Sequence, residues 1–184
     1  LREAVLYKVT RSIKVTLLQE QRDGKWCNWM VDDPPHWWAM EYYAKRATGR
    51  VLTAGLGLGL VHHHLVENPA VTGILAIEQS QDVIDLVSPH LPPAAKVLKA
   101  DFFDVVKALH RGDVDYVVLD IWVANGWEDK RQLLGEVYSA KAQVKAQLGD
   151  IPVAIHGFPT ISDVSWSITP ELMEQLKLVS ETYY

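Results

Sequence analysis

The sequence has a single cysteine, Cys27, in 184 residues. One thiol excludes an internal disulfide framework, and it also excludes the zinc sites that take several cysteine ligands. A chain that needs no disulfide suits a reducing compartment, so we expect the protein to work in the cytoplasm.

Long hydrophobic runs and an excess of positive charge are also missing. No apolar run approaches the roughly 18 residues that a membrane-spanning helix needs, and no signal peptide is visible. The formal net charge of −5 does not favour binding to the phosphate backbone of a nucleic acid. We therefore expect neither a membrane nor a nucleic acid as partner. Hydrophobic residues make up 48% of the chain, which is enough for the core of one domain.

From Arg50 onward, short apolar runs alternate with segments of helical periodicity. The runs "ILAI" and "YVVL" are continuous, as expected for strands of a parallel sheet that is covered by helices on both faces. Alternating strands and helices form right-handed βαβ units. The sequence therefore predicts a Rossmann-like α/β domain over residues 50–184, with a mostly parallel sheet and helices on both faces. The expected helices cover about 59–68, 80–90, 102–110, 128–148 and 169–181.

Residues 1–49 have a different pattern and form a predicted amino-terminal extension. Residues 13–31 surround an Asp-Gly pair that is typical of two-residue turns, so they predict a β-hairpin. The following segment predicts a helix that is capped by Asp32 or Asp33, has prolines near its start and ends at Gly49.

The first strand of the Rossmann-like domain leads into a turn that contains Gly55, Gly57 and Gly59. In a doubly wound sheet this turn borders the crevice beyond the carboxyl ends of the strands, where ligands bind. Glycine permits unusual φ values and lets a ligand approach the main chain without a Cβ in the way. The dinucleotide fingerprint requires glycine at positions one, three and six, but position six here is Leu60. The spacing therefore favours a ligand that carries an adenosine but no pyrophosphate.

Three carboxylates fall at the carboxyl ends of successive predicted strands, namely Glu78, Asp101 and Asp120. Glu78 lies about 20 residues after the glycine turn, where an acidic side chain can accept hydrogen bonds from both ribose hydroxyls. Acidic residues at strand ends also cap the next helix, so each of the three has a structural alternative. Their combination with the glycine turn favours a nucleoside site.

Residues 50–122 resemble the class I S-adenosylmethionine-dependent methyltransferases, and most of all their spermidine-synthase-like branch. "VLTAGLGLG" resembles the glycine motif, and "ILAIEQSQDVIDLVSPHL" resembles the acidic second-strand motif with its following helix. "KADFFDVV" and "YVVLDIW" resemble the motifs of the third and fourth strands. The hairpin and helix before residue 50 loosely resemble the amino-terminal segment of the polyamine synthases.

The resemblance implies S-adenosylmethionine, or its decarboxylated form, as the cofactor. The three glycines would approach its methionine part and ribose, and Glu78 would hold the ribose hydroxyls. Asp101 would contact the adenine amino group, and Phe102 would pack near the adenine ring. Asp120 would be the catalytic residue beside the transferring carbon. In the polyamine synthases the matching aspartate takes a proton from the attacking amine.

Two features depart from the family pattern. Thr53 replaces the acidic residue that is commonly found two positions before the first glycine, and the residues "IW" follow Asp120. The leading interpretation is methyl transfer to a small molecule such as an amine. The alternatives are aminopropyl transfer, as in spermidine synthase, and a non-catalytic binding or assembly module with the same fold.

The three consecutive histidines, His62, His63 and His64, do not form a metal-binding pattern. Neighbouring residues of a helix point about 100° apart, so the three side chains cannot face one ion. We expect no metal site and assign these histidines to a partly solvated helix face.

The extension is rich in aromatic residues, with four tryptophans between positions 26 and 38. They can enclose a cationic amine, or they pack the extension onto the sheet or form a subunit contact in a homo-oligomer. His36 and Glu41 in the same segment are weak candidates for substrate contacts. His156, at the end of the fifth predicted strand, is either a general base or a hydrogen-bonded loop residue.

Overall fold

The computed structural model describes residues 12–122 and 130–157, in which strands and helices alternate after an amino-terminal hairpin. The strands are β1 (Leu17–Arg22), β2 (Lys25–Val31), β3 (Gly49–Ala54), β4 (Val71–Glu78), β5 (Ala95–Lys99), β6 (Tyr116–Leu119) and β7 (Val153–Ile155). The helices are α1 (Pro34–Ala44), α2 (Leu60–Glu67), α3 (Gln81–Val87), the short 3-10 helix η1 (Ser88–His90), α4 (Phe102–Ala108) and α5 (Lys130–Leu148).

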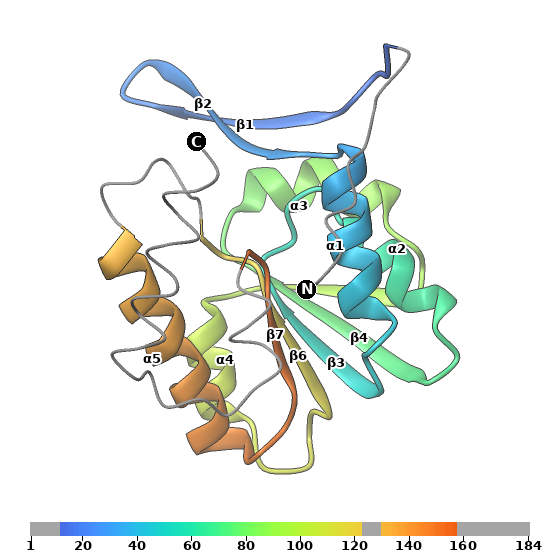
Figure 1. Cartoon of the computed structure of the whole chain (residues 1–184), viewed down its shortest axis with the longest axis vertical. Coiled ribbons are helices and arrows are strands. Elements are labelled where there is room, and N and C mark those ends of the chain that lie inside the picture. The colour runs from blue at the N-terminus through green and yellow to red at the C-terminus, as the bar shows by residue number, and fades with distance from the viewer. Residues whose placement is uncertain (1–11, 123–129, 158–184) are drawn as a thin grey trace, which may run out of the picture.

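The last five of these strands form one parallel sheet in the order β5-β4-β3-β6-β7, and β1 and β2 form a separate antiparallel pair. Figure 1 shows α1, α2 and α3 on one side of the parallel sheet and α4 and α5 on the other. The predicted fold class, a mostly parallel sheet with helices on both faces and an added hairpin, is confirmed.

Three hydrophobic clusters hold these helices against the sheet, and the smallest of them, with Ala76 and Val87, lies under α3. Leu52 and Val117 belong to the core under α4 and α5, whereas Val51 and Val118 belong to the core under α1 and α2. Successive side chains of a strand point to opposite faces, so neighbouring residues enter different cores. Full burial of a valine or leucine side chain contributes about 1.5–3 kcal/mol, and this explains why the central strands are apolar on both faces.

The hairpin turns at Asp23 and Gly24, which have φ angles of 50° and 75°. Positive φ at both central residues gives a turn whose twist matches that of the paired strands. The register pairs Arg22 with Lys25 across this turn. The hairpin that the sequence predicted around the Asp-Gly pair is therefore confirmed.

The helix of the extension begins as predicted but ends early. The Asp33 carboxylate accepts a hydrogen bond from the His36 main-chain N–H at 3.0 Å, and prolines occupy the first helical positions. The helix ends at Ala44, because the amides after Lys45 bond to carbonyl groups three residues back and tighten the chain. The prediction that Gly49 ends this helix is wrong, since Gly49 is the first residue of β3.

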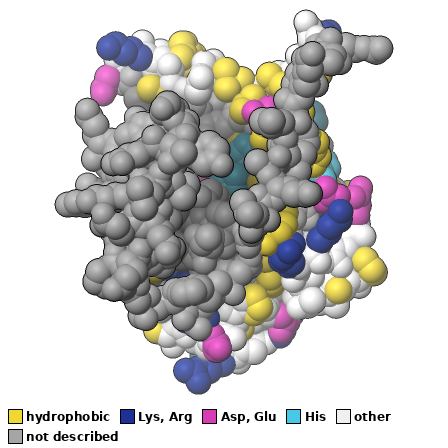
Figure 2. Space-filling model, viewed as in Figure 1, with side chains coloured by type: hydrophobic (Ala, Val, Ile, Leu, Met, Phe, Trp, Pro, Cys, Tyr) yellow, Lys and Arg dark blue, Asp and Glu magenta, His cyan; other side chains and the backbone are white. Residues whose placement is uncertain are grey.

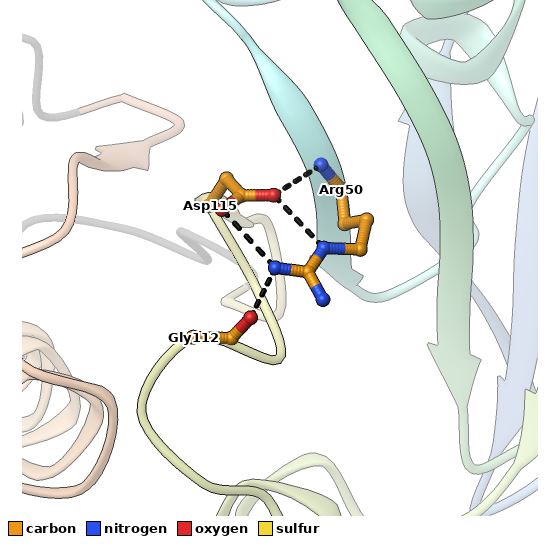
Figure 3. Close-up of polar contacts among 3 residues, drawn as sticks. All are labelled: Arg50, Gly112 and Asp115. Carbon is orange, nitrogen blue, oxygen red and sulfur yellow. Dashed lines mark hydrogen bonds and ion pairs between the residues drawn. The ribbon is translucent and has the colours of Figure 1, made fainter.

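Arg50 and Asp115 tie together the amino ends of β3 and β6 (Figure 3). The Asp115 carboxylate accepts hydrogen bonds from the Arg50 main-chain N–H at 2.8 Å and from its Nε at 3.0 Å. Arg50 Nη2 also donates to the carbonyl group of Gly112. The Arg50 hydrogen bonds hold the pKa of Asp115 below its ordinary value. This contact fixes the two central strands at the end of the sheet that is opposite to the predicted ligand crevice.

Some predictions lie outside the described residues, namely the helix over residues 169–181 and the first two residues of the helix predicted from residue 128. The division into an extension and a domain at residue 50 stays a prediction. Within the two described ranges, no helix is both long enough and apolar enough to cross a membrane.

Candidate functional site

The topological switch point of the sheet lies between β3 and β6. The chain runs outward from β3 through β4 to β5, and then returns to place β6 on the other side of β3. Parallel strands present their carboxyl ends at one edge, and the crevice outside a switch point is where open α/β sheets bind ligands. The residues that follow these strands therefore form the candidate site.

The glycine turn after β3 is closely packed by the protein itself. Gly55, Gly57 and Gly59 all have positive φ, which L side chains rarely adopt. A Cβ on Gly55 would lie under 3.0 Å from the carbonyl oxygen of Asp120, and a Cβ on Gly59 would lie 2.5 Å from Leu91. The protein's own packing is therefore sufficient to require glycine at these positions.

Met30 of the hairpin lies over the middle of this turn. Its sulfur is 2.5 Å from the position that a Cβ on Gly57 would take, and it accepts a hydrogen bond from the Leu58 N–H at 3.1 Å. Methionine is unbranched and flexible, so a change of its side-chain angles can release this contact. A ligand that approached Gly57 would have to displace Met30 first.

Glu78 joins the glycine turn to the start of α3. One carboxylate oxygen accepts a hydrogen bond from the Leu56 N–H and the other from the Ser80 N–H, both at 2.9 Å. The side chain is therefore directed along the crevice edge toward the glycine turn. Each carboxylate oxygen has two acceptor positions, so Glu78 retains the capacity to bind two hydroxyl groups.

Asp101 caps α4. Its Oδ1 atom accepts hydrogen bonds from the main-chain N–H groups of Phe103 at 2.8 Å and Asp104 at 3.1 Å, and its Oδ2 accepts one from the Gln79 side chain. Phe102 is only 3% exposed and belongs to the core under α4 and α5. The roles of Asp101 and Phe102 toward an adenine ring stay predictions, and the contacts present are structural.

Thr53 points away from the crevice toward α2. Its Oγ1 atom lies 2.9 Å from Nε2 of His62, and both side chains are buried. Burial lowers the pKa of His62 to about 4, so its ring is neutral at physiological pH. Thr53 thus pairs with a core histidine, and the prediction of a partly solvated helix face is wrong for His62.

The other two histidines of α2 lie against Trp37 of α1. The ring centroids of His64 and Trp37 are 4.9 Å apart with the rings edge to face, and His63 lies 6.2 Å from the same tryptophan. Trp37 therefore packs α1 onto α2 and not directly onto the sheet. Trp26, Trp29 and Trp38 are exposed, so packing onto the sheet is not confirmed for them. In the part of the chain that the structure describes, no three His, Cys, Asp or Glu side chains are arranged to hold a metal ion.

Asp120 follows β6 and lies beside the glycine turn. Its main-chain N–H donates to the Ala54 carbonyl at 3.0 Å, and its own carbonyl packs against Gly55. Burial raises the pKa of the Asp120 carboxyl group to about 6, and His36 acts in the opposite direction. A carboxyl group that titrates this close to neutral pH is typical of residues that exchange protons with a substrate.

Two histidines that are far apart in the sequence stack near Asp120. The ring centroids of His36, from α1, and His156, after β7, are 4.6 Å apart with an angle of 10° between the ring planes. Burial lowers the pKa of both histidines, and Asp120 counteracts this effect at His36. Figure 2 shows histidine side chains near the centre of one face of the molecule and beside α1 and α2. The structure therefore brings His36, His156 and Asp120 together, although no spacing in the sequence joins them.

Tyr43 holds α1 against the end of β7. Its hydroxyl group donates to the Ile155 carbonyl at 3.2 Å, and its ring meets that of His156 edge to face at 6.2 Å. Burial raises the pKa of Tyr43, so the phenol stays protonated. Sequence reasoning missed this residue. Tyr43 lies two helical turns after His36, so the two residues share one face of the helix. This spacing is the sequence signal by which Tyr43 could have been found.

The residues after Asp120 face the other side of the sheet. Trp122 and Phe103 line a hollow of about 460 Å³ between α4 and α5, together with residues of α5. This departure from the family pattern therefore adds an aromatic wall to the face opposite to α1.

Comparisons with known proteins find similarity to solved structures at low sequence identity. No protein-family model matches the chain, and a search of curated proteins finds no match. Similar solved structures include a spermidine synthase from Thermotoga maritima, with 15% identity and a TM-score of 0.43 over 52% of this chain and 38% of that chain. Another spermidine synthase, in complex with the transition-state analogue AdoDATO, has 15% identity and a TM-score of 0.42 over 56% of this chain and 46% of its own.

A precorrin 8w decarboxylase from Methanobacterium thermoautotrophicum is also similar, with 14% identity and a TM-score of 0.46 over 82% of this chain and 72% of that chain. The chain spans less than half the length of the two spermidine synthases. Identities this low assign no activity, so the function must be argued from the site itself.

Proposed function

We propose that the protein is a transferase that binds S-adenosylmethionine, or its decarboxylated form, and transfers a group from the sulfonium to a small molecule. The observation that carries this proposal is the contact between Asp120 and Gly55. It packs the main chain of Asp120, a residue with an ionisable side chain, against a glycine turn at the switch point of a parallel sheet. Methyl transfer is the leading reaction because it is the commoner use of such a site, and aminopropyl transfer is the alternative.

The residues of the crevice fit a nucleoside once Met30 moves. Glu78 is held by two main-chain N–H groups and keeps acceptor positions for two ribose hydroxyls. Met30 is held over Gly57 by one hydrogen bond to a thioether, which is a weak acceptor. We expect the several contacts of a nucleoside to outweigh that single bond.

The bound sulfonium would supply an electrophilic carbon next to a positive charge. The tasks left to the chain are to orient the acceptor, exclude water and receive the acceptor's proton. Asp120 suits a site of this kind because its carboxyl group, with a pKa of about 6, is mostly ionised at neutral pH and can stabilise the positive charge that the proton brings. Replacement of Asp120 by Asn should lower turnover about 10²-fold or more while leaving nucleoside affinity nearly unchanged. Equal losses of both would count against a catalytic role.

Thermal denaturation with added ligands tests the binding. A ligand of the folded state raises the melting temperature when its concentration well exceeds Kd. S-adenosylmethionine, S-adenosylhomocysteine and methylthioadenosine should raise it, and NAD should not. Glu78→Gln should lose most of this shift, whereas Glu67→Gln, at an exposed position of α2, should keep it. A shift with NAD alone, or an undiminished shift in Glu78→Gln, would contradict the proposal.

A non-catalytic module is the competing function, and two contacts favour it. Thr53 is paired with His62 instead of facing the crevice, and Met30 covers Gly57. Turnover separates the two functions. A methyltransferase releases S-adenosylhomocysteine when it is supplied with amine or hydroxyl acceptors, and an aminopropyltransferase releases methylthioadenosine. Nucleoside binding without release of either product would favour the module.

A further inference from the structure

The stacked pair of His36 and His156 is a buried polar feature that the predicted strand-end site does not explain. We propose that His36 is the base of the transfer reaction, with its Nε2 atom taking the proton from the acceptor's N–H or O–H group, and that His156 positions its ring. This proposal rests on the proposed function and deepens it.

One contact determines which nitrogen of His36 is free. The Val31 carbonyl lies beside the His36 ring and raises its pKa, and a ring nitrogen that faces a carbonyl is favoured in its protonated form. His36 Nε2 is buried and has no hydrogen-bond partner among the described residues. In the neutral ring the hydrogen is therefore on Nδ1, and Nε2 presents a lone pair.

The stack orients that lone pair. The rings of His36 and His156 are nearly parallel at 4.6 Å, and Tyr43 meets His156 edge to face. Since Tyr43 is itself bonded to the Ile155 carbonyl, the ring planes are fixed from the end of β7. His156 Nδ1 is also buried without a partner in the described part of the chain. The two stacked rings thus carry two buried, unpaired nitrogens, and a polar ligand group would relieve the free-energy cost of burying them.

The groups around the two stacked rings determine whether His36 is protonated. Burial and His156 lower the pKa of His36, whereas Asp120 after β6 and Asp33 at the start of α1 raise it. The net direction is downward, so Nε2 is free to accept a proton at neutral pH. Tyr43 on the same helix stays neutral because burial raises its pKa. Once His36 is protonated, the Asp120 carboxylate stabilises the imidazolium, as the carboxylate does in a Ser-His-Asp triad.

The atoms and electrons of this step balance. The acceptor's nitrogen or oxygen forms a bond to the transferred carbon, and the bond from that carbon to sulfur breaks with its electron pair left on sulfur. The acceptor's proton goes to His36 Nε2 and is then released to solvent. No oxidant or reductant is needed.

His36→Asn tests the base directly. The Asn side-chain amide can replace Nδ1 as the donor to Val31, but it has no atom at the position of Nε2. We expect kcat to fall about 10²-fold with little change in KM. The acidic limb of the pH–rate profile should change, because only the Asp120 carboxyl group then titrates in it. His90→Asn, at an exposed position of η1, is the matched control and should change neither. An unchanged kcat and profile in His36→Asn would overturn the proposal.

Two further variants separate a positioning role from a structural one. Asp120→Asn removes a charge that raises the pKa of His36, so the acidic limb of its residual activity should move to lower pH. His156→Phe keeps an aromatic ring in the stack but removes a group that lowers that pKa, so the limb should move to higher pH. If the acidic limb of the pH–rate profile lies at the same pH in both variants, the assignment of His36 as the base is contradicted.

NMR titration of the His36 ring in the ligand-free protein gives a readout that does not depend on turnover. The ring should titrate below the ordinary value of about 6.5, and its midpoint should move down in Asp120→Asn and up in His156→Phe. If the titration midpoint of His36 is the same in both variants as in the original protein, this inference is overturned, even when the protein binds the nucleoside. The absence of any thermal shift with the sulfur nucleosides would instead overturn the proposed function.

Discussion

The carbonyl oxygen of Asp120 occupies the space that a Cβ atom on Gly55 would need, and Gly55 has a φ of 87°. The main chain at the end of β6 is thus packed against the turn that follows β3. These two strands border the switch point, so a change at Gly55 must displace the candidate catalytic residue.

Alanine substitutions at Gly55 and Gly57 should have different costs. A methyl group on Gly55 would meet the main chain of Asp120, whereas one on Gly57 would meet the flexible end of Met30. The positive φ alone costs roughly 1–2 kcal/mol at either position. We expect Gly57→Ala to lower the free energy of unfolding by about that amount and Gly55→Ala by about 3 kcal/mol or more. Urea denaturation measures both.

A second substitution at Met30 provides the matched comparison. Met30→Ala should recover part of the stability that Gly57→Ala loses, because it removes the atoms that the new methyl group meets. It should recover none of the loss in Gly55→Ala. Equal recovery in both backgrounds would show that the two glycines are not packed as described.

Removal of the Met30 side chain should also strengthen nucleoside binding. Met30→Ala frees the Leu58 N–H and uncovers Gly57, so a ligand no longer has to displace the thioether. We expect the Kd for S-adenosylhomocysteine to fall roughly fivefold, which corresponds to about 1 kcal/mol. Isothermal titration calorimetry measures this change, with Leu17→Ala on the exposed part of β1 as a control for loosening of the hairpin. Weaker binding in Met30→Ala would mean that Met30 is part of the ligand site.

Asp120→Asn should stabilise the protein near pH 7. Burial raises the pKa of Asp120 from 3.8 to about 6. Because the folded-state value is the higher one, the contribution of this group to stability is fully present below about pH 4 and is lost as the pH rises through about 6. A shift of about two units corresponds to at most about 3 kcal/mol. The neutral Asn variant should therefore gain up to this amount at pH 7 and nothing at pH 4.

Urea denaturation at the two pH values measures the gain. Asp85→Asn, at an exposed position of α3, should show no comparable difference. A destabilised Asp120→Asn at pH 7 would show that the charged carboxylate is favourably bound in the folded protein, contrary to the stated cause of its pKa.

Acid should destabilise the fold through His62. Burial lowers its pKa from 6.5 to about 4, and the lower value belongs to the folded state. The stability that it contributes is therefore fully present above about pH 6.5 and is lost as the pH falls toward 4, by on the order of 3 kcal/mol. His62→Leu removes the titrating group and should flatten the pH dependence of the free energy of unfolding in this window. If the free energy of unfolding depends on pH as steeply in His62→Leu as in the original protein, groups other than His62 cause the acid sensitivity.

The pairing of His62 with Thr53 can be tested at neutral pH. Thr53→Val keeps the shape of the side chain but leaves Nε2 of His62 without its partner. Loss of one buried hydrogen bond should cost about 1–3 kcal/mol in the free energy of unfolding. A change within about 0.5 kcal/mol would mean that the bond contributes no net stability.

The parts of the structure that local rules govern were predictable from the sequence. Continuous apolar runs indicated buried parallel strands, the Asp-Gly pair indicated the hairpin, and Asp33 caps its helix as expected. The end of α1 was not predictable, because it depends on hydrogen bonds that tighten the chain before Gly49.

The candidate site was predictable only in part. Strand ends placed Glu78 and Asp120 on the ligand side, because parallel strands share one carboxyl edge. The stack of His36 on His156 joins the amino-terminal extension to the end of the sheet, and no local spacing encodes that contact. The position of Met30 over Gly57 is likewise a tertiary contact, which a glycine pattern cannot reveal.

A crystal structure of the protein with S-adenosylhomocysteine tests the central claim most directly. The account predicts the ribose hydroxyls on Glu78, the amino-acid part of the ligand over Gly57, and Met30 turned away from the Leu58 N–H. A crevice that still holds Met30 against Leu58, with no nucleoside at Glu78 under saturating ligand, would contradict it.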